Sequence, residues 1–372
     1  MSATIYTCRS PAEFDEAVAQ VSKLLRNGKL VVVPTETVYG IAINLALRSA
    51  VQEAMELKHI KTPAPWVVHV PDAAATHRFL SKIPPVASRL MRKCWPGPVA
   101  FELPVAPEDR RKLTPLVGAA TADEMTQGGM MTLRCPDNAF THALLSRVKH
   151  PIAILGAGKS TAAHSADAIA KTISEAVAAI VDDGPTRYRK ASTVVQVQQD
   201  QLKVVRPGVI DARIIYRMAD LTILFVCSGN TCRSPMAAGF AREFLAKRLH
   251  TRPQDLADHH VLVLSAGTGA FSGMPATADA IAAAAELGAD IETHSSQPLT
   301  GDLLRRADVI YTMTKGHLKE IIEMNPSVAD KTFTLDENGD VSDPIGSSRE
   351  NYRKVAQKIH ALIAQRLDGI EL

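Results

Sequence analysis

The sequence predicts an α/β protein with two domains, at residues 1–212 and 221–372. Its 372 residues are more than one domain usually contains, and 46% of them are hydrophobic, enough for two cores. In the second half, short β-branched runs alternate with helix-like stretches, which is typical of a parallel sheet covered by helices on both faces. The boundary is expected within 211–220, between the turn-forming Arg206-Pro207-Gly208 and an apolar run that begins at Leu221.

The expected elements follow from the hydrophobic pattern of each segment. In the first domain, a helix at 11–27 precedes a short strand at 30–33, and the polar segment PTETVYG follows at 34–40. By itself, this polar segment indicates only an ordinary turn. The second domain alternates strands, at 221–226, 261–264 and 309–313, with an Ala-rich helix at 277–287 and a closing amphipathic helix at 350–367.

Composition and charge exclude several classes of protein. The net charge of +3 is too small to indicate nucleic-acid binding by bulk electrostatics. No apolar run is long enough to span a bilayer, and the N-terminus has no apolar core of signal-peptide length. The cysteines are odd in number and irregularly spaced, which argues against a disulfide framework; they are Cys8, Cys94, Cys135, Cys227 and Cys232. We therefore expect a cytoplasmic protein without a membrane partner.

The most informative segment is residues 221–240, LTILFVCSGNTCRSPMAAGF. A β-branched run ends at Cys227, and a polar loop of five residues leads to Arg233, where a helix is expected to begin. Backbone N–H groups of such a loop, together with the N-terminus of a helix, bind an oxyanion. The segment therefore predicts a phosphate cradle with a cysteine at its base.

Each side chain of this cradle has an expected part in phosphoryl transfer. The positive field lowers the pKa of Cys227 and makes it a thiolate nucleophile, Arg233 binds two phosphoryl oxygens, and Ser234 hydrogen-bonds the sulfur. The alternative is a buried structural cysteine at the end of a strand. Gly229 and Asn230 favour the cradle, because both residue types adopt the unusual backbone angles that a phosphate loop needs.

This segment resembles the signature of the low-molecular-weight protein phosphatases, V-C-x-G-N-x-C-R-S-P. The resemblance continues to the end of the chain through Ser265-Ala266-Gly267-Thr268, the stretch 308–317 (DVIYTMTKGH) and Asp343-Pro344. It implies a Rossmann-like, four-stranded parallel sheet with the phosphate-binding loop at the carboxyl end of its first strand. It also implies that Asp343 is the general acid and base, and that the substrate contacts the loop residues Ser228, Gly229, Asn230, Thr231, Cys232 and Ser234.

The same resemblance implies a phosphorylated protein as the substrate, without a cofactor or a metal ion. Tyrosine-specific members usually have an aliphatic residue at the position of Thr231 and aromatic residues after Asp-Pro. This chain has Thr231 and Asp-Pro-Ile345-Gly346, as in the arginine-specific members, so phosphoarginine is favoured over phosphotyrosine. The alternative is that Thr231 is merely a small loop residue. The family also implies a reversible disulfide between Cys232 and Cys227, with simple packing of Cys232 as the alternative.

The first domain resembles the YrdC-type threonylcarbamoyl-AMP synthases. Besides residues 34–40, the motifs that carry the resemblance are Trp95-Pro96-Gly97-Pro98, Arg134 with Pro136-Asp137, Asp183-Gly184-Pro185, residues 192–195 (STVV) and Arg206-Pro207-Gly208. The resemblance implies an α+β fold with a twisted mixed sheet. It also implies synthesis of threonylcarbamoyl-adenylate from threonine, bicarbonate and ATP with Mg²⁺, the first step toward a modified adenosine in tRNA. The implied contacts to threonine, nucleotide or phosphate are Thr35, Thr37, Lys58, Ser192 and Arg206.

The sequence departs from this second family at two places. Where the family has Lys-x-Arg, this chain has Lys58-His59-Ile60 with Lys61 one place later, and where the family has Ser-x-Asn, it has Gly156-Ala157-Gly158. Either Lys61, Ser160 and Thr161 substitute after a small loop shift and the synthase is retained, or the domain only binds a nucleotide or an RNA element. In the second case it regulates or localises the phosphatase. The departures favour this second interpretation, because each lost charge-assisted hydrogen bond costs roughly 1.5–3 kcal/mol.

Overall fold

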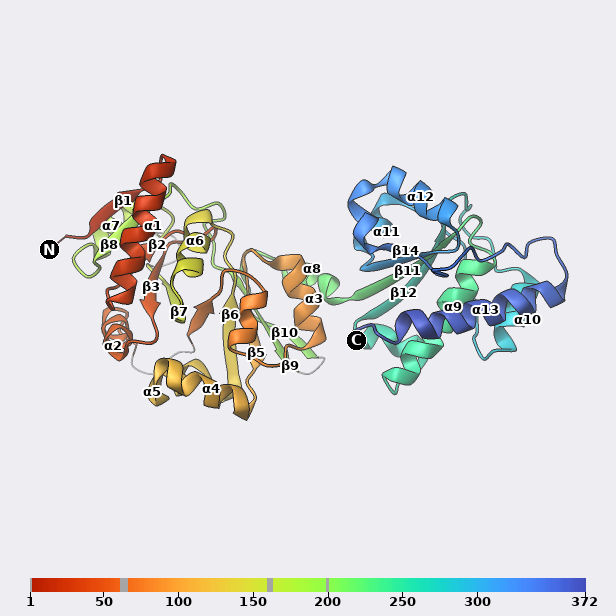
Figure 1. Ribbon diagram of the computed structural model, residues 1–372, viewed down its shortest axis with the longest axis horizontal. Coiled ribbons are helices and arrows are strands. Elements are labelled where there is room, and N and C mark those ends of the chain that lie inside the picture. The colour runs from red at the N-terminus through yellow and green to blue at the C-terminus, as the bar shows by residue number, and fades with distance from the viewer. Residues whose placement is uncertain (1, 61–65, 159–162, 199–200) are drawn as a thin grey trace. The chain divides into compact units, whose positions relative to one another are not determined.

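The computed structural model describes residues 2–60, 66–158, 163–198 and 201–372. The chain divides into two compact units, Met1–Ala219 and Asp220–Leu372, and each has its own sheet and its own apolar core (Figure 1). Helices flank both sheets, which confirms the predicted α/β class.

In its described residues, the first unit is built on a ten-stranded sheet with the order β1-β8-β2-β3-β7-β4-β6-β5-β9-β10. Parallel and antiparallel pairs both occur; β2 is parallel to β8 and antiparallel to β3. This confirms the predicted mixed sheet. The strands are β1 (Thr4–Thr7), β2 (Val31–Val33), β3 (Gly40–Asn44), β4 (Val67–His69), β5 (Val99–Pro104), β6 (Met130–Arg134), β7 (Ile152–Gly156), β8 (Ala179–Asp182), β9 (Thr193–Gln198) and β10 (Gln201–Arg206).

Helix α1 (Pro11–Arg26) shows how local sequence sets the ends of a helix. At its start, the Ser10 side chain caps the helix by accepting a hydrogen bond from the Glu13 N–H at 3.3 Å. Lys23 and Arg26 lie in the last turn, where positive charges interact favourably with the negative end of the helix dipole. The other helices of the first unit are α2 (Arg48–Leu57), η1 (Ala74–Arg78), α3 (Pro85–Cys94), α4 (Pro107–Val117), α5 (Ala119–Met125), η2 (Gln127–Gly129), α6 (Ala139–Arg147), α7 (Ala166–Ile173) and α8 (Ala212–Ala219).

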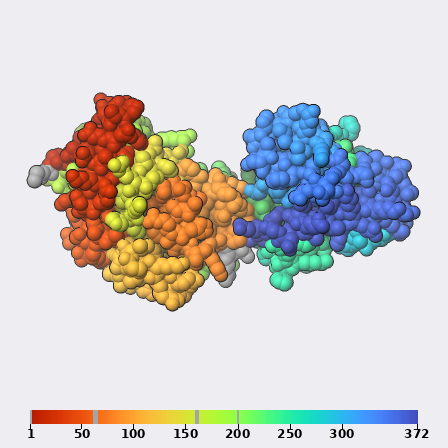
Figure 2. All heavy atoms as spheres, in the orientation of Figure 1, coloured from red at the N-terminus to blue at the C-terminus, as the bar shows by residue number. Residues whose placement is uncertain are grey.

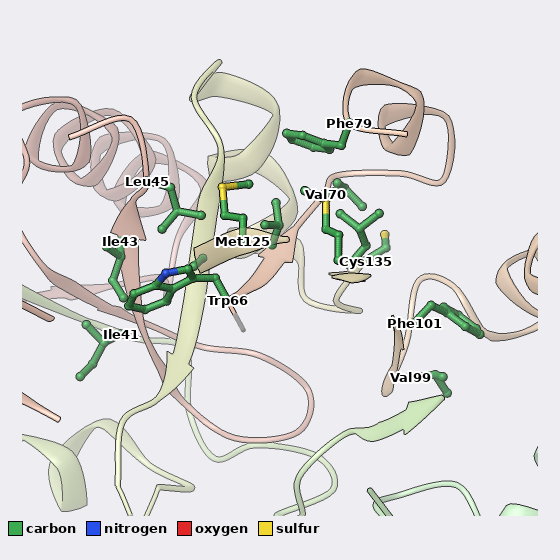
Figure 3. Close-up of a cluster of buried hydrophobic side chains, with 14 of the residues drawn as sticks. Ile41, Ile43, Leu45, Trp66, Val70, Phe79, Val99, Phe101, Met125 and Cys135 are labelled. Atoms are coloured by element: carbon green, nitrogen blue, oxygen red, sulfur yellow. The ribbon is translucent and has the colours of Figure 1, made fainter. Parts of the chain in front are cut away.

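The sheet of the first unit is packed on both faces. Successive residues of a strand point to opposite faces, so Ile41 and Ile43 belong to one apolar cluster while Ala42 belongs to another. Figure 3 shows the first of these clusters, in which Ile41, Ile43 and Leu45 lie around the indole of Trp66. Burial on both faces explains why the central strands are apolar throughout.

Helix α8 occupies the segment between the two predicted domains, and it packs on α3 of the first unit. Arg89 Nε donates to the Ala219 carbonyl at 3.2 Å, and Lys93 Nζ donates to the Met218 carbonyl at 3.0 Å. Ile215 is fully buried in the core of the first unit. These contacts make α8 part of the first unit.

The second unit, whose residues are all described, has four parallel strands in the order β12-β11-β13-β14. This confirms the predicted four-stranded parallel sheet. The central strand β11 (Leu221–Cys227) is buried along all 7 residues, as its uninterrupted apolar sequence requires. The other strands are β12 (Val261–Gly267), β13 (Val309–Thr312) and β14 (Thr332–Thr334).

Helices cover both faces of the second sheet (Figure 1). One face, with Phe225 and Tyr311, packs against α9 (Arg233–Arg248), α10 (Ala278–Ala285) and α13 (Arg349–Leu367). The other face, with Leu224 and Ile310, packs against α11 (Gly301–Arg306) and α12 (Lys315–Met324), whose outer sides form surface in Figure 2. The remaining short helices are η3 (Pro253–His259) and η4 (Pro326–Lys331). Of the helices described in the chain, none is both long enough and apolar enough to cross a bilayer.

Candidate functional site

The predicted phosphate loop lies between the end of β11 and the start of α9, at the carboxyl edge of the parallel sheet. Its neighbour is the end of β12, where Thr268 N–H donates to the Cys227 carbonyl at 2.9 Å and Gly269 N–H donates to the Ser228 carbonyl at 3.0 Å. A Cβ added at Gly267 would lie only 2.3 Å from the Ser228 carbonyl oxygen and 2.9 Å from Asn230 N. The absence of a side chain at Gly267 therefore lets β12 approach the loop closely.

Asn230 holds the loop from inside, with its side chain completely buried. Its Nδ2 donates to Ser234 Oγ and Ser265 Oγ, both at 2.9 Å, and its Oδ1 accepts from Gln297 N–H at 2.9 Å. His294 Nε2 donates to the Asn230 carbonyl at 2.7 Å. Of the two loop residues expected to adopt unusual angles, Asn230 has the positive φ of 55°, whereas Gly229 does not.

The Cys227 sulfur lies at the base of this loop and is only 2% exposed. It is hydrogen-bonded to Ser234 Oγ at 2.9 Å and accepts from Asn230 N–H at 3.3 Å. Burial raises the pKa of the thiol, although the hydrogen bonds from Ser234 and Asn230 and the Arg233 charge lower it. The predicted lowering of this pKa is therefore wrong for the protein in this state. Desolvation by burial outweighs the hydrogen bonds and the Arg233 charge.

Arg233 and Asp343 meet above the loop. Arg233 Nη2 donates to Asp343 Oδ2 at 2.5 Å and to Ser228 Oγ at 3.4 Å, and Nη1 donates to the Val341 carbonyl at 3.2 Å. The guanidinium is buried, and its Nε has no hydrogen-bond partner among the described residues. The Asp343 side chain is 41% exposed, so it can face both the loop and solvent.

His317, at the start of α12, is part of the same network, although no motif in the sequence predicted a role for it. Its Nε2 is hydrogen-bonded to Ser228 Oγ at 2.9 Å, and its Nδ1 to Thr314 Oγ1 at 2.8 Å. Ser265, His294 and Gln297 were missed in the same way. His317 lies within the stretch 308–317, and Ser265 lies in the second matching stretch, so the resemblance marked both segments but not these contacts.

The Cys232 side chain lies against the start of α10 and against α13. Cys232 Sγ lies 3.7 Å from Thr231 Oγ1, 3.4 Å from Thr277 Oγ1 and 3.5 Å from the Tyr352 hydroxyl. Cys227 and Cys232 are both free thiols in this structure. The reversible disulfide between them stays a prediction.

In the first unit, a cavity of about 150 Å³ brings together four of the five predicted residues, Thr35, Thr37, Ser192 and Arg206. Arg206 Nη2 donates to the carbonyl and to Oγ of Ser192, both at 3.0 Å. Lys58 is not part of the cavity lining. Its Nζ instead donates to the carbonyl of Gly156, which does line the cavity, at 2.8 Å. The residues expected to replace the missing polar groups of the family lie outside the described residues; they are Lys61, Ser160 and Thr161.

Arg134 organises this cavity, although it was not among the predicted contacts. Its Nη2 donates to Glu36 Oε1 at 2.8 Å and to Thr37 Oγ1 at 2.9 Å. Glu36 Oε2 and His69 Nε2 are buried and have no partner among the described residues. Burial, together with the Arg134 charge, lowers the pKa of His69 to about 3, so this imidazole is neutral. The cavity lining therefore combines two guanidinium groups, a neutral imidazole and hydroxyl groups, and the Glu36 carboxylate is paired with the Arg134 side chain that lines it.

Comparison with known proteins gives relatives for each half of the chain. The first half is similar to a threonylcarbamoyl-AMP synthase of Bacillus subtilis, with 32% identity over 196 residues, 52% of this chain and 54% of that protein. The second half is similar to a protein-arginine-phosphatase of Bacillus subtilis, with 37% identity over 150 residues, 39% of this chain and 93% of that protein. It is also similar to a probable low molecular weight protein-tyrosine-phosphatase, EpsP, of Ralstonia solanacearum, with 38% identity over 152 residues, 40% of this chain and 91% of that protein.

The chain thus spans about half the length of the synthase that it matches and nearly all of each phosphatase. Two family models match as well. The Sua5/YciO/YrdC model, described as "Telomere recombination", matches residues 23–208, and the model described as "Low molecular weight phosphotyrosine protein phosphatase" matches residues 222–371. The chain therefore belongs to both families, to the first through its N-terminal half and to the second through its C-terminal half.

Proposed function

We propose that the domain of residues 221–372 hydrolyses phosphorylated proteins through a phosphocysteine intermediate, without a cofactor, in the cytoplasm. The observation that carries this proposal is that one loop holds Cys227 Sγ, through Asn230 N–H, and also contacts the pair formed by Arg233 and Asp343, through Ser228 Oγ. These are a nucleophile, an oxyanion clamp and a proton donor, the three groups that phosphoryl transfer through cysteine requires.

The reaction has two displacements at phosphorus. Phosphoryl oxygens first displace the Asp343 carboxylate from Arg233, and the freed carboxylate takes up the proton of the Cys227 thiol. The resulting thiolate attacks phosphorus, the S–P bond forms as the bond to the leaving group breaks, and Asp343 passes that proton to the leaving atom. A water molecule then attacks the phosphocysteine, its proton passes to Asp343, and the S–P bond breaks to release inorganic phosphate and the thiolate. Arg233 must exchange its Asp343 partner for phosphoryl oxygens at the start, so substrate binding frees the carboxyl group for proton transfer.

We propose phosphoarginine over phosphotyrosine as the preferred group. Ile345, which follows Asp343-Pro344 and is 62% exposed, is aliphatic, and Gly346 has no side chain, so neither residue supplies an aromatic wall for a phenyl ring. Thr231 is partly exposed at the loop and carries a hydroxyl that can bond a guanidinium edge. The relatives include an arginine phosphatase at 37% identity and a probable tyrosine phosphatase at 38% identity. Overall similarity therefore does not favour either substrate, and the proposed preference rests on Thr231, Ile345 and Gly346.

Hydrolysis of a phosphoarginine peptide and a phosphotyrosine peptide, measured side by side, tests both parts of the proposal. Cys227→Ser serves as the blank, because serine is a far weaker nucleophile in such a loop. We expect turnover that depends on Cys227 and a higher kcat/KM for phosphoarginine. A higher value for phosphotyrosine would refute the substrate preference alone, and turnover retained by Cys227→Ser would refute the mechanism.

For the domain of residues 1–212, we propose binding of a nucleotide or an RNA element in the cavity around Arg134 and Arg206. The two guanidinium groups and the hydroxyls of Thr35, Thr37 and Ser192 suit phosphate oxygens. No three His, Cys, Asp or Glu side chains in the described residues converge as metal ligands, so Mg²⁺ would enter with the phosphates of ATP. Retained threonylcarbamoyl-AMP synthesis is the alternative.

Threonine-dependent release of pyrophosphate from ATP in the presence of bicarbonate and Mg²⁺ separates these two functions. The binding-only proposal predicts nucleotide binding that Arg206→Gln weakens, without pyrophosphate release. Release that depends on threonine and is lost in Thr37→Val would instead establish the synthase.

A further inference from the structure

His317 connects helix α12 to the phosphate loop through a single side chain. Its imidazole is buried, with 7% exposure, and is hydrogen-bonded at both nitrogens, to Ser228 Oγ at 2.9 Å and to Thr314 Oγ1 at 2.8 Å. Ser228 Oγ also accepts from Arg233 Nη2 at 3.4 Å. A chain of hydrogen bonds therefore runs from the start of α12 to the guanidinium that we propose as the phosphoryl clamp.

One assignment of these hydrogen bonds gives every donor an acceptor. Arg233 can only donate, so Ser228 Oγ is an acceptor toward it, and the Ser228 hydroxyl proton is available for His317 Nε2. In this assignment Nε2 accepts, and the imidazole proton lies on Nδ1, where it is donated to Thr314 Oγ1. A neutral His317 with its proton on Nδ1 thus satisfies the whole chain. Protonation at Nε2 would make it a competing donor to Ser228 and would add a positive charge near Arg233.

The charged groups that face His317 come from three segments. Arg233 on α9 opposes protonation, whereas Glu320 on α12 and Asp340 and Asp343 on the segment before α13 favour it. Burial is the largest influence and, with Arg233, lowers the pKa of His317 below its ordinary value of 6.5. His317 is therefore neutral at neutral pH, the state that the hydrogen-bond chain requires.

We propose that His317 is a positioning residue which, through Ser228, holds Arg233 over the loop when Asp343 releases it to take up the proton-transfer role. This inference rests on the proposed phosphatase function. Arg233 Nη2 donates to both Asp343 and Ser228. When Asp343 gives way to the substrate, the hydrogen bond to Ser228 keeps Nη2 directed toward the phosphoryl oxygens.

Two substitutions at one position separate the contact to the loop from the contact that supports the helix. His317→Asn places an amide near the position of Nδ1, so the contact to Thr314 is kept and the contact to Ser228 is lost. His317→Gln places its amide near the position of Nε2, so the contact to Ser228 is kept without a group that titrates. Ser228→Ala removes the same contact from the loop side, at an exposed residue where folding is least affected.

We expect kcat/KM at pH 7 to fall about three- to tenfold in His317→Asn and in Ser228→Ala, the loss that one hydrogen bond represents, and to recover in His317→Gln. In the wild type, kcat/KM should also fall as the pH drops through the pKa of His317, measured independently by NMR of the imidazole. His317→Gln should lack that inflection. Equal kcat/KM in all four proteins, or an inflection that persists in His317→Gln, would overturn the proposal.

Affinity for inorganic phosphate, measured at pH 7 by titration calorimetry, separates failure of this inference from failure of the proposed function. Absence of Cys227-dependent turnover in the wild type would reject the phosphatase function. The phosphate affinity then still decides the role of His317, because the proposed clamp requires Arg233 to bind the ion even where no chemistry follows. Absence of phosphate binding in the wild type would reject the positioning role as well. Weaker phosphate binding in His317→Asn and Ser228→Ala supports the positioning role, and unchanged binding in both rejects it.

Discussion

Arg233 Nη2 and Asp343 Oδ2 lie 2.5 Å apart, although 110 residues separate them along the chain. The pair joins the start of α9 to the loop before α13, so the two groups that we propose as clamp and proton donor are brought together by folding and not by local sequence. Each charge compensates the other, and the proposed mechanism requires phosphoryl oxygens to replace the carboxylate at Arg233.

Asp343→Asn tests this exchange. We expect kcat to fall about 100-fold or more, because the amide cannot supply the proton to the leaving group. Binding of inorganic phosphate should be retained or tightened, since Arg233 loses a competing anion. Steady-state kinetics together with phosphate inhibition measure both effects, and the exposed Asp330→Asn in η4 is the matched control. A fall in kcat accompanied by lost phosphate binding would mean that Asp343 only supports the fold of the site.

Ser234→Ala is expected to raise the pKa of the Cys227 thiol further. Burial already raises this pKa, and the Ser234 hydrogen bond is the first of the opposing influences. Thiolate reactivity should therefore appear only at higher pH in the variant, with a turnover about tenfold lower at pH 7. Alkylation of Cys227 by iodoacetamide, followed by peptide mass spectrometry across pH, measures this directly. The buried Cys135, whose pKa burial raises to about 12, is the internal reference and should not respond.

Gly267→Ala should damage the loop by steric contact alone. The new methyl group would meet the Ser228 carbonyl at 2.3 Å and Asn230 N at 2.9 Å, distances that real structures do not tolerate. We expect about 1–3 kcal/mol lower stability and reduced turnover as the loop is displaced. Gly269→Ala is the control, because an added Cβ there has nothing within 4 Å. Equal behaviour of the two variants in thermal unfolding and kinetics would show that the close approach is unimportant.

Thr231→Val keeps the shape of the side chain and removes its hydroxyl. If this hydroxyl recognises the guanidinium, the preference for phosphoarginine over phosphotyrosine should shrink by about tenfold, and Thr231→Ser should restore it. The ratio of the two kcat/KM values is the readout. A ratio that is the same in all three proteins would assign the preference to the segment around Ile345 instead.

The first unit should lose stability as the pH falls. His69 has a folded pKa of about 3 against an ordinary value of 6.5, so the fold favours the neutral imidazole. Its contribution is fully present above pH 6.5 and is lost as the pH falls from there toward 3. Both tryptophans, Trp66 and Trp95, lie in this unit, so denaturant unfolding followed by their fluorescence reports on it alone.

His69→Asn retains a donor for the Val67 carbonyl but does not titrate. Its unfolding midpoint should therefore change less between pH 7 and pH 4.5 than that of the wild type. The exposed His77→Asn should behave like the wild type. If His69→Asn shows the full wild-type pH dependence, another group in the first unit is responsible.

Local sequence was sufficient to predict those features that depend on residues close together in the chain. Cys227 ends a strand, Arg233 begins a helix and a five-residue loop joins them, so the direction of the chain alone places both residues at the carboxyl edge of the sheet, one at each end of the loop. The parallel sheet followed from alternating apolar segments for the same reason, because each segment carries its own periodicity.

The hydrogen-bond partners within each site could not be predicted from the sequence, because they come from segments that are distant along the chain. Ser228 and His317 are 89 residues apart, Asn230 and Gln297 are 67 apart, and Thr37 and Arg134 are 97 apart. Burial is likewise a property of the folded chain, and it reversed the expected direction of the Cys227 pKa. The sequence by itself determined which chemical groups the loop carries. Only the folded structure decided how these groups are paired, screened from water and held, because desolvation and hydrogen bonding act between residues that no local pattern relates.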